Sequence, residues 1–220
     1  ASAQGHSRLR HLIPMKTIHS RDNPLLKKLV RLAASSRERR LGGITILDGQ
    51  HLIEAYCETR KAPCELIVAS ESAMQRESIA HLMENAWTLS SAIIEDQLLA
   101  RLSQVVTSSG ILALIRTPPA PEMPEQIGDA VFLEEVQDPG NLGSILRSAL
   151  GAGIGRVFLS SGCVFAWSPK VVRAGMGAHF HLAIHENIGL QDIVARAAGS
   201  IVATQLLGGE DIDKTDLKGT

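Results

Sequence analysis

Apolar runs of strand length alternate with amphipathic stretches along the first half of this chain. An asparagine and a proline at 23–24 form a helix-start signal, and the leucines that follow recur at helical spacing. Further runs are expected to form strands at 44–47, 66–69 and 110–115 and helices at 51–59 and 72–84. The pattern predicts a small α/β unit.

The second half repeats strand and helix in strict succession. Strands are expected at 129–136, 156–159, 181–184 and 200–204, and helices are expected to begin near Asn141, at Pro169 and at Leu190. Such alternation predicts a parallel sheet with helices on both faces. Ligands in such sheets bind at the carboxyl ends of the strands, so the loop 138–147 and the strand end at 204–206 are expected on one rim.

Four prolines within residues 118–124 separate these parts, because a proline-dense stretch forms neither a helix nor a central strand. The predicted organisation is a flexible arm or expression remnant, a first α/β domain, a semi-rigid linker and a second α/β domain, at 1–14, 15–116, 117–128 and 129–220. Met15 is the expected natural start, and the preceding residues contain no apolar core of signal-peptide length.

Composition excludes several classes of protein. With 45% hydrophobic residues in 220, the chain is expected to be globular, and no run is long enough to cross a bilayer. Cys57, Cys64 and Cys163 are odd in number and lack metal-ligand spacing, which favours a reducing cytosol without a structural disulfide. The histidines form no cluster either, so no metal is expected and the predicted location is cytoplasmic.

Charge is distributed unevenly although the net charge is only −1. Residues 1–40 contain ten basic side chains against Asp22 and Glu38. Such asymmetry is typical of phosphate-backbone contact. The candidate RNA-binding residues here are Arg21, Lys27, Lys28, Arg31, Arg37, Arg39 and Arg40. The alternative is a solvated helix face with a disordered basic arm.

The segment 138–149 concentrates chemistry at the start of a helix. Pro139 discourages helix at Asp138, and Asn141 is a good N-cap residue. Gly143, Arg147 and the glycine at 151 share one helix face, which would let a phosphate or sugar approach the guanidinium closely. Each residue taken singly also fits a cap, a turn or a solvated charge. The glycines at 151–155 follow this helix and precede a strand, so they predict a helix end and not a dinucleotide loop.

The pattern Asp-Pro-x-Asn-x-Gly-x-Ile-x-Arg-x-Ala at 138–149 resembles the first motif of the SpoU/TrmH family of RNA 2′-O-ribose methyltransferases, with Ser148 where the family generally has threonine. The pattern Ser-Arg-x-Asn-Pro-Leu-x-Lys at 20–27 is similar to the substrate-binding domain of rRNA-modifying members. The resemblance implies a small L30e-like α/β RNA-binding domain followed by an α/β parallel-sheet SPOUT domain with a trefoil knot, incomplete in the sequence given. Two later family motifs are absent from it, and a longer natural protein is expected.

The same resemblance implies S-adenosyl-L-methionine as the methyl donor, RNA as the partner, with rRNA preferred over tRNA, and a homodimer without membrane or metal. Asn141 and Arg147 are the implied catalytic residues, and Thr204 is an expected contact to the cofactor adenine. Lys170 and Arg173, in a Lys-x-x-Arg-Ala segment that the family shares, would touch RNA phosphate or form structural salt bridges.

Two other classes of function stay open. A non-catalytic RNA-binding protein would use the basic amino-terminal domain alone. A nucleotide-dependent α/β enzyme of different chemistry is disfavoured because the sequence contains no phosphate-binding loop.

Overall fold

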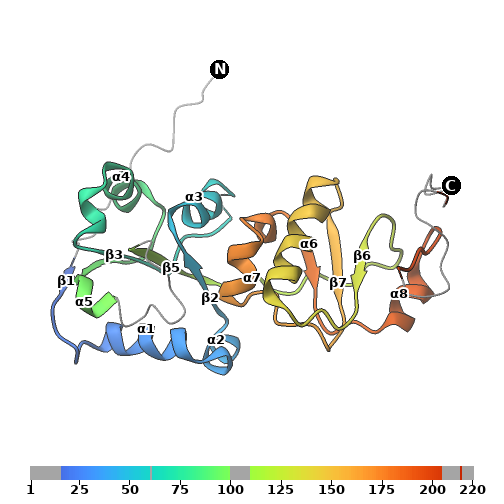
Figure 1. Cartoon of the computed structure of the whole chain (residues 1–220), viewed down its shortest axis with the longest axis horizontal. Helices are drawn as coiled ribbons and strands as arrows, with labels where there is room; N and C mark the ends of the chain where they lie inside the picture. Colours follow the sequence, from blue (N-terminus) through green and yellow to red (C-terminus); the bar gives the residue numbers. More distant parts are fainter. Residues whose placement is uncertain (1–15, 60, 100–109, 205–213, 215–220) are drawn as a thin grey trace, which may run out of the picture.

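A computed structural model describes residues 16–59, 61–99, 110–204 and 214 of the chain. Two sheets organise it, and they lie side by side along the long axis of the molecule (Figure 1). We call residues 16–116 the amino-terminal half and residues 131–204 the carboxy-terminal half.

The amino-terminal half contains a five-stranded mixed sheet of order β1-β4-β3-β5-β2. Its strands are β1 (Lys16–Ile18), β2 (Ile44–Asp48), β3 (Leu66–Ser70), β4 (Ser91–Ile94) and β5 (Ile111–Arg116). β4 runs parallel to β1 and β3, whereas β5 runs antiparallel to β2 and β3. The helices are α1 (Pro24–Ala34), α2 (Ser36–Gly42), α3 (Gln50–Thr59), α4 (Glu77–Asn85) and α5 (Asp96–Leu99), with a 3-10 turn η1 (Ala73–Gln75).

Helices cover both faces of this sheet (Figure 1). α1 begins as predicted, since the Asn23 side chain accepts a hydrogen bond from Leu25 N and Pro24 takes the first helical position. Its buried residues Leu26 and Leu29 pack on one face of the sheet, and α3 and α4 cover the other. β2 and β3 are buried along their whole length, which explains why they read as continuous apolar runs.

The carboxy-terminal half contains a three-stranded parallel sheet of order β6-β7-β8. Its elements are β6 (Val131–Leu133), α6 (Pro139–Gly151), β7 (Arg156–Leu159), α7 (Pro169–Ala174), the 3-10 turn η3 (Ala178–Phe180), β8 (Ala183–His185) and α8 (Leu190–Arg196). α6 and α7 pack together on one face, while Phe158 points to the other face and meets Ile193 of α8. The predicted parallel sheet with helices on both faces is confirmed.

The predicted strand at 200–204 is wrong for this structure. These residues form no strand, and Ile201 and Val202 are 53% and 60% exposed. The chain does approach the sheet just before them, where Ala197 forms an isolated parallel bridge with Ile127. The predicted helix end at 151–155 is confirmed, because α6 stops at Gly151 and Gly153 takes a positive φ of 80°.

One apolar core runs through both halves. It joins Leu47 and Ile53 of the amino-terminal half to Leu142, Leu146 and Val171 of the carboxy-terminal half. Two further contacts cross the junction, from α3 and the segment that follows it to η3. The Tyr56 and Phe180 rings meet edge to face with their centroids 5.3 Å apart, and Lys61 Nζ donates to Phe180 O at 2.8 Å. The two halves therefore pack as one body.

Candidate active site

The loop after β6 delivers α6 to the carboxyl rim of the parallel sheet. Asp138 caps the helix, since its side chain accepts a hydrogen bond from Asn141 N at 2.7 Å and Pro139 occupies the first turn. Asn141 is therefore the third helical residue, and the prediction that it is the N-cap is wrong. Because its side chain is not used for capping, the exposed Asn141 amide is available to a ligand.

Arg147 lies further along α6 and is exposed. Its guanidinium makes no hydrogen bond or ion pair with any residue that the structure describes. A guanidinium presents five donors in a planar fork that matches phosphate oxygens. Arg147 can therefore hold a phosphate without first breaking a bond inside the protein.

Gly143 does not open the helix to a ligand, contrary to the sequence-based expectation. It is buried where α6 crosses α7, and a Cβ added to it would lie 2.4 Å from Ala174 Cβ and 2.7 Å from Val171 O. The glycine is needed for close helix packing, which fixes the position of α6 and of the loop before it.

Hydrogen bonds join the loops of the rim to one another. The loop after β6 meets the loop after β7 at Glu135 N, which donates to Ser160 Oγ at 3.1 Å, and at Val136 O, which accepts from Val164 N at 2.9 Å. The segment after β8 joins them, because Ile188 N donates to Leu159 O at 2.9 Å. The rim at which α6 and its Asn141 begin is thus a connected platform.

A buried histidine supports this platform. His179 is 2% exposed, and its Nε2 lies 2.9 Å from Ala166 O. Burial lowers the pKa of His179 to about 4, so the ring is neutral at pH 7. Its role is structural, because it fixes the segment between β7 and α7.

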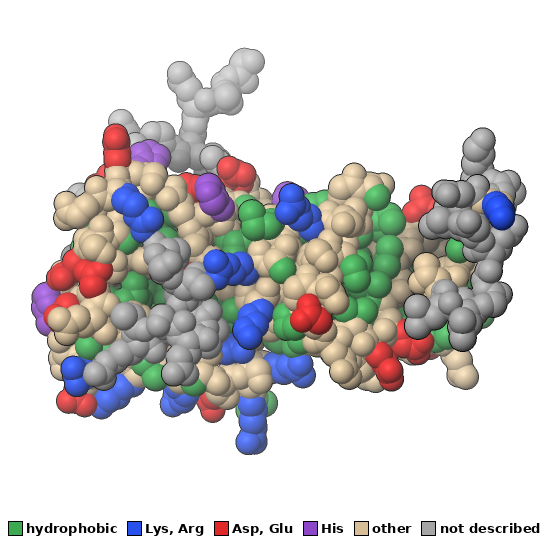
Figure 2. Space-filling view, in the orientation of Figure 1, with side chains coloured by type: hydrophobic (Ala, Val, Ile, Leu, Met, Phe, Trp, Pro, Cys, Tyr) green, Lys and Arg blue, Asp and Glu red, His purple; other side chains and the backbone are tan. Residues whose placement is uncertain are grey.

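Most of the predicted RNA-binding residues lie exposed on α1 and α2, or just before α1: Arg21, Lys27, Lys28, Arg31, Arg37 and Arg40. Figure 2 shows Lys and Arg side chains gathered along this edge and towards the junction of the halves. Lys27 and Arg31 are partly balanced by ion pairs with Asp22 and Glu38.

Arg39 does not belong to this surface. It is 6% exposed and its guanidinium donates to Leu32 O and Ala33 O, at the carboxyl end of α1. The expectation that Arg39 contacts RNA is therefore corrected, since its donors stabilise a helix end.

The two predicted basic residues of α7 have different surroundings. Lys170 is exposed and forms no ion pair with a described residue. Arg173 Nη1 lies 3.7 Å from Asp48 Oδ2, and the Asp48 side chain is only 2% exposed. The structural salt bridge that the sequence left open is therefore present at Arg173, and it links the two halves.

Thr204 is exposed and lies outside any strand, so no described element places it on the rim. The described residues thus supply an exposed asparagine and an exposed arginine on α6. Within the described ranges, no helix is long and apolar enough to cross a membrane. The same ranges contain no group of three or more potential metal ligands.

Sequence reasoning missed two rim residues that face the amino-terminal half, Ser160 and Glu186. Each directly follows the last residue of a parallel strand, β7 or β8. The rule that ligands bind beyond the carboxyl ends of such strands would have identified both.

Comparison with known proteins gives the chain a clear set of relatives. Residues 129–220 match the SpoU rRNA Methylase family. The zebrafish (Danio rerio) rRNA methyltransferase 3B, mitochondrial, is 36% identical over 175 residues, which cover 76% of this chain and 38% of that protein. The 23S rRNA (guanosine(2553)-2′-O)-methyltransferase RlmP of Bacillus subtilis is 26% identical over 77% of this chain and 64% of its own length.

Solved structures agree on the fold. The crystal structure of an rRNA methyltransferase from Sinorhizobium meliloti has a TM-score of 0.71 and 25% identity, and the match covers 90% of this chain and 75% of that one. The SpoU methyltransferase AviRb from Streptomyces viridochromogenes, in complex with the cofactor AdoMet, has a TM-score of 0.65 at 20% identity, over 78% and 66% of the two chains. The chain spans between about a fifth and two fifths of the mitochondrial relatives that it matches.

Proposed function

Residues 129–220 match the SpoU rRNA Methylase family, and from that premise we propose that the chain belongs to this family and that the protein is an S-adenosylmethionine-dependent enzyme that methylates ribose 2′-hydroxyls of RNA, with rRNA as substrate. The carrying observation is the exposed Arg147 on a helix that begins at the carboxyl rim of the parallel sheet and is held by its close packing on α7. The names of the relatives, which include an rRNA 2′-O-methyltransferase, support rRNA over tRNA.

Arg147 and Asn141 are proposed to act on the RNA side of the reaction. S-adenosylmethionine, when bound, supplies the electrophilic methyl group. Arg147 holds the phosphate next to the target ribose and stabilises the negative charge that develops on the 2′-oxygen, while Asn141 positions Arg147 or the ribose. Arg147 is a poor general base, because a guanidinium stays protonated in proteins and has no acceptor for a proton.

Thr204 remains the proposed cofactor contact. The isolated parallel bridge between Ile127 and Ala197 brings the chain that leads to Thr204 beside the segment that precedes β6.

RNA is proposed to lie on the amino-terminal half, against the exposed basic residues of α1 and α2, with Lys170 as an additional phosphate contact. Arg173 is proposed to make a weaker contact with RNA phosphate than Lys170, because its guanidinium is already paired with Asp48. Phosphate contacts of this kind make affinity fall steeply with salt. An affinity for RNA that does not change with salt concentration would contradict this role of the basic residues.

The oligomeric state and the cellular location of the protein are also proposals. A homodimer is proposed through the carboxy-terminal half, where Leu190 and Val194 lie one helical turn apart on α8 and are 46% and 54% exposed. Analytical ultracentrifugation of the protein in solution would show whether it is a dimer.

A cytoplasmic location is proposed on the likeness to the bacterial relative, although other relatives are named mitochondrial.

The function is tested by methyl transfer from labelled S-adenosylmethionine to rRNA with the full natural protein. Arg147→Ala should abolish transfer with little loss of RNA affinity. Arg156→Ala is the matched control, because Arg156 is also exposed but lies at the amino end of β7, away from the rim. Equal loss of transfer and affinity in Arg147→Ala would count against catalysis. RNA binding without transfer by the wild type would favour the non-catalytic alternative.

A further inference from the structure

A polar hollow of about 340 Å³ lies between the two halves. Arg40 and Thr117 line it from the amino-terminal side, and Ser160, Phe165, Glu186 and Asn187 line it from the loops after β7 and β8. Its volume is at the lower end of the ~300–1,000 Å³ typical of small-ligand pockets. It is connected to the catalytic loop, because Ser160 Oγ accepts the hydrogen bond from Glu135 N.

Arg40 gives the hollow a cationic surface beside an aromatic ring. Its Cζ lies 4.4 Å from the centroid of the Phe165 ring, so the guanidinium is held in place by a cation–π contact. Its side chain makes no hydrogen bond or ion pair within the described part of the chain. The guanidinium donors are therefore available to a ligand.

Glu186 gives the hollow an acceptor. One carboxylate oxygen, Oε1, accepts a hydrogen bond from Ala166 N at 2.9 Å, which orients the group. The second oxygen receives no hydrogen bond from a described residue. A carboxylate is acceptor-only when ionised, so this oxygen favours a ligand that presents an N–H group.

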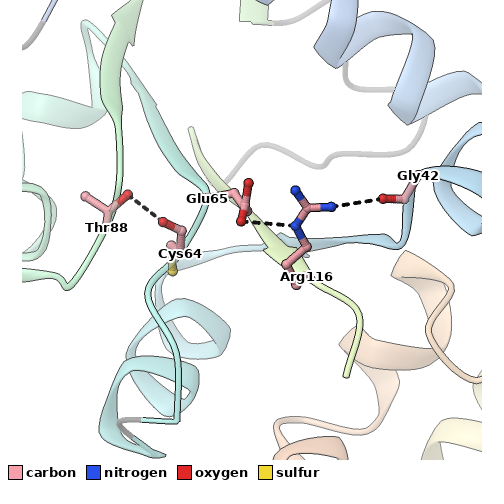
Figure 3. Close-up of polar contacts among 5 residues, drawn as sticks. All are labelled: Gly42, Cys64, Glu65, Thr88 and Arg116. Carbon is pink, nitrogen blue, oxygen red and sulfur yellow. Dashed lines mark hydrogen bonds and ion pairs between the residues drawn. The ribbon is translucent and has the colours of Figure 1, made fainter. Parts of the chain in front are cut away.

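The amino-terminal wall of the hollow is fixed before any ligand binds. Arg116, at the end of β5, donates through Nε to Glu65 Oε1 at 3.1 Å and through Nη1 to Gly42 O at 3.5 Å (Figure 3). Thr117 N donates to Gly43 O at 2.9 Å. These bonds hold the end of α2, the helix that carries Arg40.

We propose that this hollow binds one unpaired base of the substrate RNA, which lies against the Arg40 guanidinium and donates an exocyclic amino group to Glu186. The proposal rests on RNA being the substrate. Proteins recognise unpaired RNA bases by stacking on aromatic rings or guanidinium planes and by hydrogen bonds to the base edge. A phosphate would satisfy Arg40 equally well, but Glu186 in the same hollow would repel it.

The hydrogen-bonding edge of the base determines which RNA the hollow should bind more tightly. Cytosine presents an amino donor where uracil presents a carbonyl oxygen, and a carboxylate accepts from the first and repels the second. The two bases have nearly the same size and shape. Fluorescein-labelled decamers of cytidine and of uridine therefore form a matched pair of probes for anisotropy titration at one salt concentration.

The wild-type protein should bind oligocytidine about tenfold more tightly than oligouridine, as one hydrogen bond to a charged acceptor allows. Glu186→Gln should reverse this ratio in favour of oligouridine. The amide oxygen still accepts from Ala166 N, so the NH2 group faces the base, where it donates to the uracil oxygen and opposes the cytosine amino group. Glu58→Gln, at an exposed position of α3, should leave both affinities unchanged. Arg37→Ala should weaken both decamers equally, as a phosphate contact does.

Salt-dependent binding of both decamers with the same ratio in the wild type and in Glu186→Gln would overturn the base site and leave RNA binding intact. Binding of neither decamer would overturn RNA recognition itself, and the base site with it.

Discussion

The packing of α6 on α7 leads to a quantitative prediction at Gly143. An ideal Cβ at this position would lie 2.4 Å from Ala174 Cβ, 2.7 Å from Val171 O and 2.8 Å from Gly175 N. Two of these atoms belong to the backbone, so no side-chain rotation relieves the overlap. In Gly143→Ala the two helices must move apart.

Two opposing effects set the size of the change. Alanine is favoured over glycine inside a helix by about 1 kcal/mol, whereas overpacking a core costs about 1–3 kcal/mol. Because the overlap involves backbone, we expect overpacking to prevail and the free energy of unfolding to fall by about 1–2 kcal/mol. For a chain of this size, that corresponds to a melting temperature lower by about 2–8 °C.

Thermal and urea unfolding followed by circular dichroism would measure this. Gly151→Ala is the matched control, since Gly151 ends the same helix and an added Cβ would have no atom within 4 Å. The control should be as stable as the wild type or slightly more so. If Gly143→Ala proves as stable as Gly151→Ala, the close crossing of α6 and α7 is refuted.

Three further changes test other parts of the structure. Burial lowers the pKa of His179 from 6.5 to about 4, so on acidification the ring takes up a proton at a higher pH in the unfolded state than in the folded state. The free energy of unfolding should therefore fall by about 2 kcal/mol from pH 7 to pH 5. Urea titrations at both pH values should show that His179→Gln loses this dependence. Arg173→Ala should lower the free energy of unfolding by about 1–2 kcal/mol, less than for a fully buried ion pair because the arginine is half exposed. In a double-mutant cycle the same change should cost less in an Asp48→Asn background. Asp138→Ala should cost about 1 kcal/mol in thermal unfolding and Asp138→Asn much less, since asparagine also caps; equal losses would contradict the capping role.

Local patterns predicted the elements that depend on local interactions. The strands expected at 44–47, 66–69 and 156–159 lie within one residue of β2, β3 and β7. Their apolar runs are buried on both faces, so sequence and burial agree. The cap of α6 was placed at Asn141, with Asp138 only as an alternative. Pro139 fits the first turn of a helix, which makes the preceding Asp138 the cap by the same rule that located α1.

Tertiary contacts account for the other errors. Three arginines at 37, 39 and 40 look alike in sequence, yet one of them is buried because the carbonyls at the end of α1 lie within its reach. The apolar run at 200–204 has the composition of a strand, but a strand also needs a paired neighbour, which local pattern does not supply. Gly143 was assigned to a ligand face because the position of α7 was unknown.

The junction of the halves is the feature with most consequence for function, and local pattern gave no sign of it. A proline-dense linker suggested two units joined semi-rigidly, whereas the structure closes them over a shared core, with Arg173 paired to Asp48 across the junction. The basic surface of α1 and α2 is thereby held in a fixed relation to α6, which carries Arg147. An RNA that contacts both need not order the two halves on binding, so less of its binding free energy is lost to that step. Loosening the junction should therefore weaken RNA binding even where no RNA-contacting residue is changed, and Tyr56→Leu, which removes the ring contact with Phe180 without changing any charge, is the variant in which to measure that loss.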